Sequence, residues 1–461
     1  MAGQRLGVLD ELFLHLEGPN THMHVGGAAV FEGPVPDYQE LLTMVARRLQ
    51  LVPRYRQKLA TVPLGLGRPV WVDDPHLNLE YHVRHTALPS PGDDEKFKRL
   101  VARIMSQQLD RSKPLWEIWV AEGLRGDRFA LIGKTHHCLI DGVSGADIMT
   151  VLLDFSPEGQ EIEPEPWRPE PEPSPDQLLL DALRERLTSP AEVLRSAQRA
   201  LSAPTKVPNR LLEAARALGA FVGGAVVDTA PPSSLNVPIG PHRRFETIVV
   251  ALADVKHVKN TLGGTVNDVV LASVAGGLRH LLQARGERVD DVELRAMVPV
   301  SVRADHERGA LGNRVASMWA PLPVYEADPV ARLSIVTEQM RDLKTSGQAV
   351  GAQILTTIGE YAPPTILAQA ARLVARQRAF NLVVTNVPGP QMPLYCMGRR
   401  MLEVFPVLPL SDNTSLGVAL FSYDGKVCFG LLGDYDAAPD LGVLAEGIEK
   451  SIAELVAAAS A

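Results

Sequence analysis

The sequence predicts an α/β protein composed of two domains of similar size, and three observations support this fold class. The chain has 461 residues, which is more than one hydrophobic core usually serves. Strand-like and helix-like stretches alternate in both halves of the chain. A segment rich in Pro and Glu, residues 156–176, lacks hydrophobic periodicity and separates the two halves.

The overall composition is that of an ordinary soluble globular protein. Apolar residues make up 46% of the chain and charged residues 22%. The formal net charge is −8, which argues against nucleic acid as a partner. The three cysteines, Cys138, Cys396 and Cys428, form no CxxC pair, so the sequence supports neither a disulfide framework nor a structural zinc site.

The N-terminal stretch does not have the pattern of a signal peptide, because Asp10, Glu11, His15 and Glu17 interrupt its apolar residues. No window approaches the roughly 20 consecutive apolar residues of a membrane-spanning helix. We therefore expect a cytoplasmic protein.

The first half of the chain has a mixed α and β pattern. Residues 23–33 are strand-like, and residues 38–59 have the periodicity of an amphipathic helix. Residues 127–139 are predicted as a strand, and residues 145–155 as the helix that follows it. Histidines 22 and 24 are interpreted as ordinary strand residues.

The middle of the chain is predicted as a linker followed by amphipathic helices. Residues 156–176 are expected to be extended and solvated. Residues 176–228 are helical in pattern and locally basic, with Leu179, Leu183 and Leu187 recurring every four residues. Two interpretations are open: helices packed on the body with a solvated basic face, or a surface that contacts a membrane or lipid droplet.

The second half resumes the alternation of strands and helices. The strands are expected at residues 245–254, 294–303 and 379–390, a long helix at 265–286, a hairpin at 414–434 around Asp424-Gly425, and a last helix from Leu441. The predicted boundaries are therefore 1–155 for the first domain, 156–235 for the linker and helices, and 236–461 for the second domain. A cleft between the two domains is the expected place for a site.

The stretch "LIGKTHHCLIDGVSG", residues 131–145, concentrates the candidate catalytic residues. If the strand continues through His137, then His136 and Cys138 lie on one side and His137 lies on the other. Asp141 lies beyond the strand, and Gly142 permits a sharp turn into the next helix.

Three interpretations of this stretch follow from the residues. A metal site needs three or four converging ligands, and the motif offers two, so no metal is expected. A nucleophilic Cys138 activated by His137 is disfavoured because the two side chains point to opposite sides of a strand. A buried histidine pair with only a packing role stays open.

The motif "HHCLIDG" matches the HHxxxDG signature of the CoA-dependent acyltransferase superfamily, which includes chloramphenicol acetyltransferases and peptide-synthetase condensation domains. More narrowly, nearly the whole chain resembles the bacterial wax ester synthase/acyl-CoA:diacylglycerol acyltransferase family. The stretches that carry this resemblance are "LDELFLHLEGPNTHMHVGG", "RSKPLWEIWV", "TVNDVVLA", "MVPVSVR", "GNRV" and "TNVPGP". Cys138, Ile140 and Thr385 depart from the residues common at their positions, which puts fine specificity in doubt.

The resemblance implies two chloramphenicol-acetyltransferase-like domains, each a mixed sheet with helices, and an active-site tunnel at their interface. It implies that acyl-CoA enters from one side and a lipid alcohol from the other, with the coenzyme A thioester as donor substrate and no cofactor. His137 is then the general base and His136 supports the site. Asp141 is architectural, and Arg303 is its expected partner.

Further candidates lie outside the motif. Asn267 and Asp268 begin a helix, where they either cap its N-terminus or, in the case of Asn267, stabilise the developing oxyanion. Pro114, Leu115 and Trp116 are expected either to shape the acceptor channel or to belong to the core. Asn386 begins a turn, residues 386–390, that is expected to line the cleft near the donor.

The function expected from the resemblance is acyl-CoA-dependent O-acyl transfer to diacylglycerol, giving triacylglycerol, or to a long-chain alcohol, giving a wax ester. Two other functions are weighed against it. One is a non-catalytic lipid-binding or lipid-droplet protein. The other is a condensation-like enzyme that acylates an amine or takes its acyl group from a carrier protein.

Overall fold

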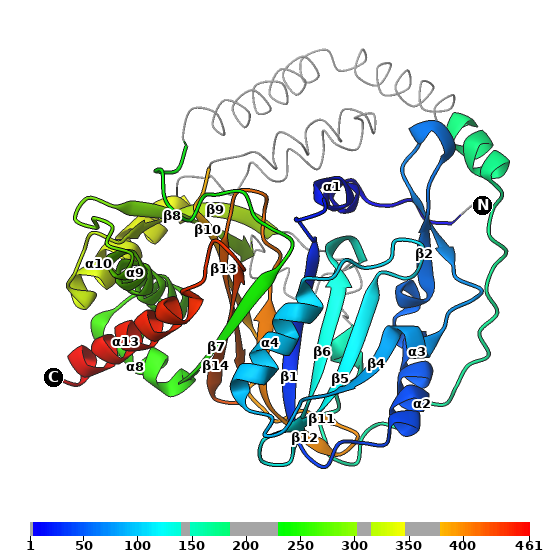
Figure 1. The fold of residues 1–461 in the computed structure, drawn as a ribbon, viewed down its shortest axis with the longest axis horizontal. Coiled ribbons are helices and arrows are strands. Elements are labelled where there is room, and N and C mark those ends of the chain that lie inside the picture. Colours follow the sequence, from blue (N-terminus) through cyan, green and yellow to red (C-terminus); the bar gives the residue numbers. More distant parts are fainter. Residues whose placement is uncertain (1–2, 140–147, 185–228, 302–314, 346–378) are drawn as a thin grey trace, which may run out of the picture.

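The computed structural model describes residues 3–139, 148–184, 229–301, 315–345 and 379–461. These residues form two lobes that lie side by side (Figure 1), each built around a six-stranded mixed sheet. The two similar-sized α/β halves expected from the sequence are therefore present.

The sheet of the N-terminal lobe has the order β11-β12-β1-β6-β5-β4. Its central strand β1 is antiparallel to both β6 and β12, whereas the edge strand β4 is parallel to β5. The strands are β1 (His24–Glu32), β4 (Val83–Ala87), β5 (Trp116–Leu124), β6 (Arg128–His136), β11 (Tyr395–Cys396) and β12 (Arg399–Val407).

The helices of this lobe are α1 (Val8–Leu16), α2 (Tyr38–Arg48), α3 (Leu79–His82), α4 (Asp94–Met105) and α5 (Ile148–Val151). Helix α4 shows why such segments fold locally. Asp93 caps its N-terminus by accepting a hydrogen bond from the Lys96 backbone N–H at 3.0 Å. Phe97, Leu100 and Ile104 then recur on one face and are buried against the sheet.

The helix expected over residues 38–59 ends at Arg48 instead, so its predicted length is wrong. Two short 3₁₀ turns follow, η1 (Leu49–Leu51) and η2 (Pro53–Arg56). Pro53 lacks the N–H that a continuing helix needs, which explains the early end. The chain then forms a hairpin of β2 (Gln57–Ala60) and β3 (Val70–Asp73), joined through the 3₁₀ turn η3 (Pro63–Gly65).

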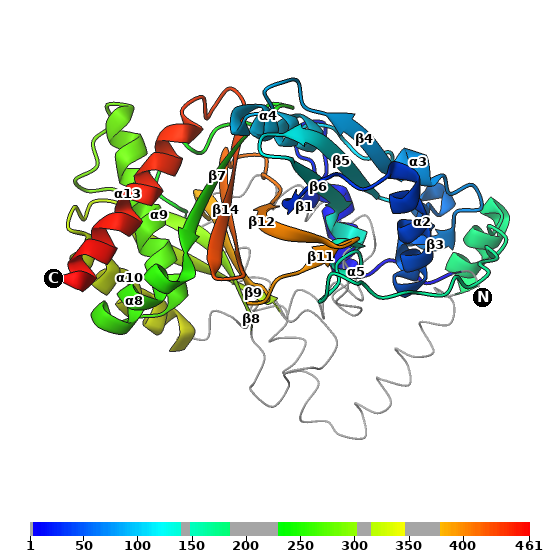
Figure 2. The ribbon, with the colours of Figure 1, turned by 90° about the horizontal axis from the view of Figure 1, so that it is seen from below.

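The sheet of the C-terminal lobe has the order β7-β14-β13-β10-β8-β9. Its strands are β7 (Arg243–Ala251), β8 (Glu293–Ser301), β9 (Val315–Pro323), β10 (Leu382–Pro388), β13 (Leu416–Tyr423) and β14 (Lys426–Asp434). Helices α8 (Leu252–Leu262), α9 (Val266–Ala284), α10 (Pro329–Thr345) and α13 (Leu441–Ser460) cover the outer face of this sheet (Figure 2).

The predicted hairpin of β13 and β14 is confirmed. Asp424 and Gly425 join the two strands with φ angles of 43° and 78°, the backbone conformation that a two-residue hairpin turn requires.

The sequence boundary between the domains does not coincide with the boundary between the sheets. Strands β11 and β12 come from the second half of the chain but complete the sheet of the N-terminal lobe, where β12 pairs with β1. Side chains from both lobes share a hydrophobic cluster at this junction. β14 approaches β12 so closely that a Cβ atom on Gly430 would lie 1.9 Å from the Pro406 carbonyl oxygen.

The Pro- and Glu-rich segment is extended, as predicted, but it is bound to the N-terminal lobe rather than solvated along its length. The Gln50 side chain donates to the Glu163 carbonyl at 2.8 Å and accepts from the Glu165 N–H at 2.9 Å. Further along, Lys58 forms an ion pair with Glu172 at 3.0 Å. The segment therefore lies along the lobe as a strap.

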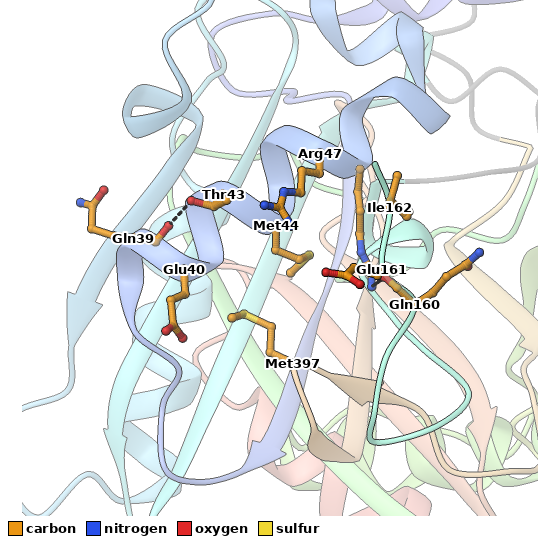
Figure 3. A pocket seen from close by; sticks show the side chains of 10 residues that line it. Gln39, Glu40, Thr43, Met44, Arg47, Gln160, Glu161, Ile162 and Met397 are labelled. Carbon is orange, nitrogen blue, oxygen red and sulfur yellow. Dashed lines mark hydrogen bonds between the residues drawn. The ribbon is translucent and has the colours of Figure 1, made fainter. Parts of the chain in front are cut away.

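A cavity of about 440 Å³ lies between this strap and helix α2 (Figure 3). Met44, Met397 and Ile162 give it an apolar lining, and Arg47 and Glu161 lie at its edge. It is separate from the histidine pair, since none of its lining residues belongs to the strand end that carries the motif.

Within the residues that the structure describes, no helix is both long and apolar enough to cross a membrane.

Candidate active site

Strand β6 ends at His136, and the chain turns there into a short 3₁₀ helix, η4 (His137–Leu139). The strand predicted over residues 127–139 therefore ends three residues earlier than expected, and it does not continue through His137. The two imidazoles nevertheless have different surroundings. His136 is buried and lies directly opposite His24 of β1, whereas His137 stacks on the ring of Phe13 from α1, with ring centroids 3.8 Å apart.

His136 belongs to a set of polar side chains, which we call the Glu17 cluster: Glu17, His24, Arg111 and His136. The side chains of Glu17, His24 and His136 are buried, whereas that of Arg111 is 49% exposed. The Glu17 carboxylate lies 3.5 Å from His24 Nε2 and 3.7 Å from His136 Nε2. It accepts a hydrogen bond from Arg111 Nε at 2.6 Å. The rings of His24 and His136 meet edge to face at 6.0 Å, since the two residues are directly opposed on β1 and β6.

The charge states in this cluster follow from burial and contacts. Burial alone would raise the pKa of Glu17, but its contacts with His24, His136 and Arg111 outweigh burial and lower that pKa to about 2. Burial lowers the pKa of His24 to about 4 and that of His136 to about 3. At neutral pH the cluster therefore holds a carboxylate, a guanidinium and two neutral imidazoles.

His137 is held through its backbone and its ring. Its N–H donates to the Met23 carbonyl at 2.8 Å, and Phe13 covers one ring face. Burial lowers the pKa of His137 below its ordinary value of 6.5. The imidazole is therefore neutral at pH 7, which is the form that can accept a proton.

The histidine turn lies beside the junction of the two lobes. The loop that leads to Met23 also reaches the C-terminal lobe, where Asn20 Nδ2 donates to the Ile239 carbonyl at 2.9 Å. Arg243 at the start of β7 donates in return to the Asn20 carbonyl. The loop that accepts the His137 N–H therefore also contacts the C-terminal lobe, and the site expected between the two halves stays a prediction.

Cys138 is not arranged as a nucleophile for His137. Its Sγ lies 2.9 Å from His136 Nδ1, and its side chain is buried. Burial raises the pKa of the thiol well above its ordinary value, so the thiol stays protonated at neutral pH.

Three predicted residues, Asp141, Gly142 and Arg303, lie outside the described residues, and the pairing of Asp141 with Arg303 stays a prediction. No group of three or more His, Cys, Asp or Glu side chains that could hold a metal ion occurs in the described ranges.

The segment Pro114 to Trp116 adjoins the site through its backbone and the core through its side chains. The Leu115 carbonyl accepts a hydrogen bond from the His136 N–H at 2.9 Å. The Trp116 ring is fully buried, stacks on His82 at 4.5 Å and donates from Nε1 to the Tyr55 carbonyl at 2.8 Å. The core interpretation is therefore the one that the contacts of Leu115 and Trp116 support.

Asn267 and Asp268 lie at the N-terminus of α9, where Thr265 and Asp268 form a capping box with hydrogen bonds of 3.2 and 2.8 Å. Helix α9 is antiparallel to α13. At the C-terminal end of α9, Arg285 Nε donates a hydrogen bond to the carboxylate of Asp440, the residue before α13. The 19 residues of α9 span about 28 Å. Because the two helices are antiparallel, the capping box lies at the end of α9 that adjoins the C-terminal end of α13, and the oxyanion role of Asn267 stays a prediction.

Asn386 lies within β10, opposite Leu420 of β13, rather than in a turn. The turn starts at Gly389, whose N–H donates to the Ser422 carbonyl at 2.9 Å. A Cβ atom on Gly389 would lie 2.2 Å from the Phe421 ring, so this close approach requires glycine.

Sequence reasoning missed the residues that surround the histidine pair. Phe13, Glu17 and His24 contact it, and Arg111 contacts Glu17; of these four, only His24 is interpreted from the sequence, as an ordinary strand residue. The sequence offered only weak signals for these residues: Glu17 is one of several charged residues in or next to the N-terminal helix, and Arg111 begins the stretch "RSKPLWEIWV".

The fold defines a class of protein. The chain superimposes on the first condensation domain of the calcium-dependent antibiotic synthetase with a TM-score of 0.58, 17% sequence identity, and coverage of 100% of this chain and 98% of that chain. At this identity the likeness shows the fold alone, which is the chloramphenicol-acetyltransferase-like fold expected from the sequence.

The chain belongs to the wax ester synthase/diacylglycerol acyltransferase family. Residues 6–270 match the model of the catalytic domain of that family, and residues 311–456 match the model of its C-terminal domain. The chain is thus an acyltransferase with the two-part organisation of this family.

Individual relatives agree over the full length. A Mycobacterium tuberculosis protein named "Probable diacyglycerol O-acyltransferase tgs1" is 38% identical over 98% of this chain and 96% of its own length. A second protein of that organism, with the same description and the designation tgs2, is 35% identical over 97% of both chains. The solved wax ester synthase/diacylglycerol acyltransferase from Marinobacter aquaeolei is 30% identical, with a TM-score of 0.71 over 99% of this chain and 100% of that chain.

Proposed function

We propose that this acyltransferase moves a long-chain fatty acyl group from coenzyme A to the hydroxyl of diacylglycerol, and that it also accepts a long-chain alcohol. The names of its mycobacterial relatives support diacylglycerol, and the Marinobacter enzyme supports the wax ester reaction. The observation that carries the proposal is the neutral, ring-stacked His137 at the junction of the lobes.

In the proposed mechanism His137 is the general base. Its unprotonated ring nitrogen takes the proton from the acceptor hydroxyl while the hydroxyl oxygen forms a bond to the thioester carbonyl carbon. Collapse of the tetrahedral intermediate breaks the carbon–sulfur bond and releases the coenzyme A thiolate, which takes the proton from His137. The ester and coenzyme A leave, and His137 is neutral again.

This chemistry requires neither a cofactor nor a covalent intermediate. A thioester is already activated, so a base, alignment of the two substrates and stabilisation of the oxyanion suffice. Coenzyme A takes part only as the carrier of the acyl substrate. The protonated, buried Cys138 supports direct transfer to the alcohol.

Asp141 and Arg303 complete the proposal as an architectural pair that fixes the turn after the histidines. Their test is replacement of Arg303 by Lys and by Ala. If both variants fold and turn over as the wild-type protein does, the pairing is wrong.

Release of coenzyme A from palmitoyl-CoA tests the function. The wild-type protein is expected to release the free thiol in the presence of diacylglycerol or hexadecanol, and little without either acceptor. The His137→Ala variant is expected to lose about 10²–10⁴-fold in kcat. The surface variant His85→Ala, whose side chain is 38% exposed, is the control for general damage.

The outcomes separate the alternatives. Unchanged turnover in His137→Ala would contradict the general-base role. No turnover with any alcohol, together with saturable binding of palmitoyl-CoA, would favour the non-catalytic lipid-binding function. Turnover only with an amine acceptor or a carrier-protein donor would favour the condensation-like reaction.

We also propose peripheral contact with a membrane or lipid-droplet surface, because the acceptor is a lipid. The helical turn at residues 175–184 supports this proposal: Leu178 is buried against the β2–β3 hairpin, whereas Leu180 is 52% exposed. Co-sedimentation with anionic vesicles tests it, and a protein that stays in the supernatant at low salt would contradict it.

A further inference from the structure

We infer that Glu17 is a positioning residue for His137 that acts through the ring of His136. The inference rests on the proposed function of His137 and adds a residue to the site. Glu17 follows the last turn of α1, and its side chain is only 4% exposed although it is charged. A buried charge of this kind is costly unless its contacts compensate, so its position requires an explanation.

The first step of the argument is the orientation of His136. The backbone N–H of Cys138 donates to His136 Nδ1 at 3.1 Å, so Nδ1 is the acceptor nitrogen of the neutral ring. The proton then resides on Nε2, which lies 3.7 Å from the Glu17 carboxylate. The negative charge of Glu17 favours this tautomer and this ring orientation.

The second step connects that ring to His137. The N–H that His136 accepts belongs to Cys138, the residue directly after His137 in η4. On the other side, the His137 N–H donates to the Met23 carbonyl. The backbone of His137 is therefore fixed between two hydrogen bonds, one of which depends on the orientation of His136.

The third step concerns how Glu17 is itself held. Arg111 donates to its carboxylate from Nε at 2.6 Å, and its Nη2 also contacts the carboxylate. Arg111 Nη2 further donates to the Leu14 carbonyl at 2.8 Å, one turn earlier in α1. The same helix also supplies Phe13, which stacks on His137. Helix α1 thus contacts both histidines, one through a charge and one through a ring.

A cavity makes the inference directly testable. Its volume is about 320 Å³, and it is lined by Glu17, Gly18, Pro19, Gln108, Leu109 and Arg111. A small carboxylate such as formate is far smaller than this cavity. If the Glu17 side chain is shortened, formate has room to take the place of its carboxylate beside Arg111 and His136.

The experiment compares turnover in Glu17→Ala and Glu17→Gln with turnover in Glu117→Gln. Glu117 is the matched control because its carboxylate is equally buried, at 4% exposed, and is paired with Arg84 and Lys134 in the same lobe. Glu17→Ala is expected to lower kcat about 100-fold, since a displacement of about 1 Å at a catalytic group has that effect. KM for palmitoyl-CoA is expected to change less than twofold, and added formate to restore at least part of kcat.

Glu17→Gln keeps an acceptor oxygen and is expected to lose less activity than Glu17→Ala. In a His136→Ala background, Glu17→Ala is expected to lower kcat further by less than about twofold, since both changes remove the same support. Equal losses in Glu17→Gln and Glu117→Gln, no formate rescue, or additive losses with His136→Ala would overturn the inference.

A readout that does not depend on turnover separates this inference from the proposed function. The ¹⁵N imidazole spectrum of histidine-labelled protein is expected to report the Nε2–H tautomer for His136 in the wild type and a loss of that preference in Glu17→Ala. If the wild-type protein is inactive but the spectrum still changes between the wild type and Glu17→Ala, the proposed function is contradicted while the contact between Glu17 and His136 is supported. An unchanged spectrum would overturn the role of Glu17.

Discussion

The imidazole of His137 is stacked on the phenyl ring of Phe13, with centroids 3.8 Å apart and ring planes inclined by 23°. The two residues are 124 positions apart in the chain, and the contact joins α1 to the turn after β6. Because Phe13 covers one face of the imidazole, only its edge and its other face are available to a substrate. Helix α1 therefore belongs to the proposed active site.

Removal of the Phe13 ring is expected to shift the pH dependence of turnover. Burial holds the pKa of His137 below 6.5, so the acidic limb of kcat/KM lies below that pH in the wild type. Phe13→Ala hydrates the imidazole, raises its pKa and moves the acidic limb to higher pH. The measurement is kcat/KM from pH 5 to 9. Phe13→Leu keeps the site apolar and is the control, and a limb that stays in place in Phe13→Ala would contradict the stacking argument.

Acid is expected to destabilise the protein below pH 6.5 because burial lowers the pKa of several histidines, most of all His24 and His136. The pKa of His24 is about 4 and that of His136 about 3 in the folded protein, whereas both are near 6.5 in the unfolded chain. Below pH 6.5 the unfolded chain therefore binds more protons, and the free energy of unfolding falls by up to about 1.4 kcal/mol per pH unit for each histidine.

The measurement is the urea midpoint between pH 8 and 5. His24→Gln is expected to reduce the slope, and His85→Gln, on the surface of β4, to leave it unchanged. Glu17, with its pKa of about 2, adds a further loss only below about pH 4.5, outside this window. A slope that does not change in His24→Gln would show that other groups bind the protons.

Local patterns were sufficient to predict much of the fold. Apolar, strand-like stretches predicted β1 and β6, and Asp424-Gly425 predicted the hairpin of β13 and β14. The pairing of β12 with β1 was not predictable, because it joins residues about 380 positions apart, such as Gly26 and Val407, and no local pattern encodes such a register. The early end of α2 was missed for a different reason, since the periodicity beyond Pro53 resembles a helix.

The candidate site was predictable where a motif carried it and not where packing built it. His136 and His137 stand in a recognisable signature, and the structure shows that the two rings have different contacts. Glu17 and Arg111 are ordinary surface residue types, and only the fold buries Glu17 beside His136. Asn267 and Asp268 illustrate the reverse case, since their motif is recognisable but the contacts that the structure shows there are those of a helix cap.

The ion pair between Arg48 and Asp154 is expected to be required for stability beneath the strap. Arg48 Nη2 donates to both carboxylate oxygens at 2.8 and 2.7 Å, and both side chains are less than 10% exposed. Asp154→Asn leaves the guanidinium without its counter-charge and is expected to cost about 3–5 kcal/mol in the free energy of unfolding. The exposed pair of Arg184 and Asp181 is the matched control.

In that control, Asp181→Asn is expected to cost less than about 1 kcal/mol, because water screens an exposed pair. The double variant Arg48→Met with Asp154→Leu is expected to recover most of the loss, since it removes both buried charges. The measurement is the free energy of unfolding in urea for the wild type, Asp154→Asn, Asp181→Asn and the double variant. A single replacement at Asp154 that costs no more than the one at Asp181 would contradict the buried-pair argument.

Two helical glycines are expected to respond in opposite ways to replacement by alanine. Alanine has a higher helix propensity than glycine by about 1 kcal/mol. At Gly442, near the start of α13, an added Cβ meets nothing within 4 Å. Gly442→Ala is therefore expected to be neutral or stabilising. At Gly277 in α9 the added Cβ would lie 2.5 Å from Ile448 Cγ1 and 3.0 Å from the Ile448 backbone nitrogen. Backbone atoms cannot move aside as a flexible side chain can, so Gly277→Ala is expected to force α9 and α13 apart at a cost of about 1–3 kcal/mol. Thermal unfolding of both variants measures the difference, and a Gly277→Ala protein as stable as Gly442→Ala would show that the two helices are not packed at this distance.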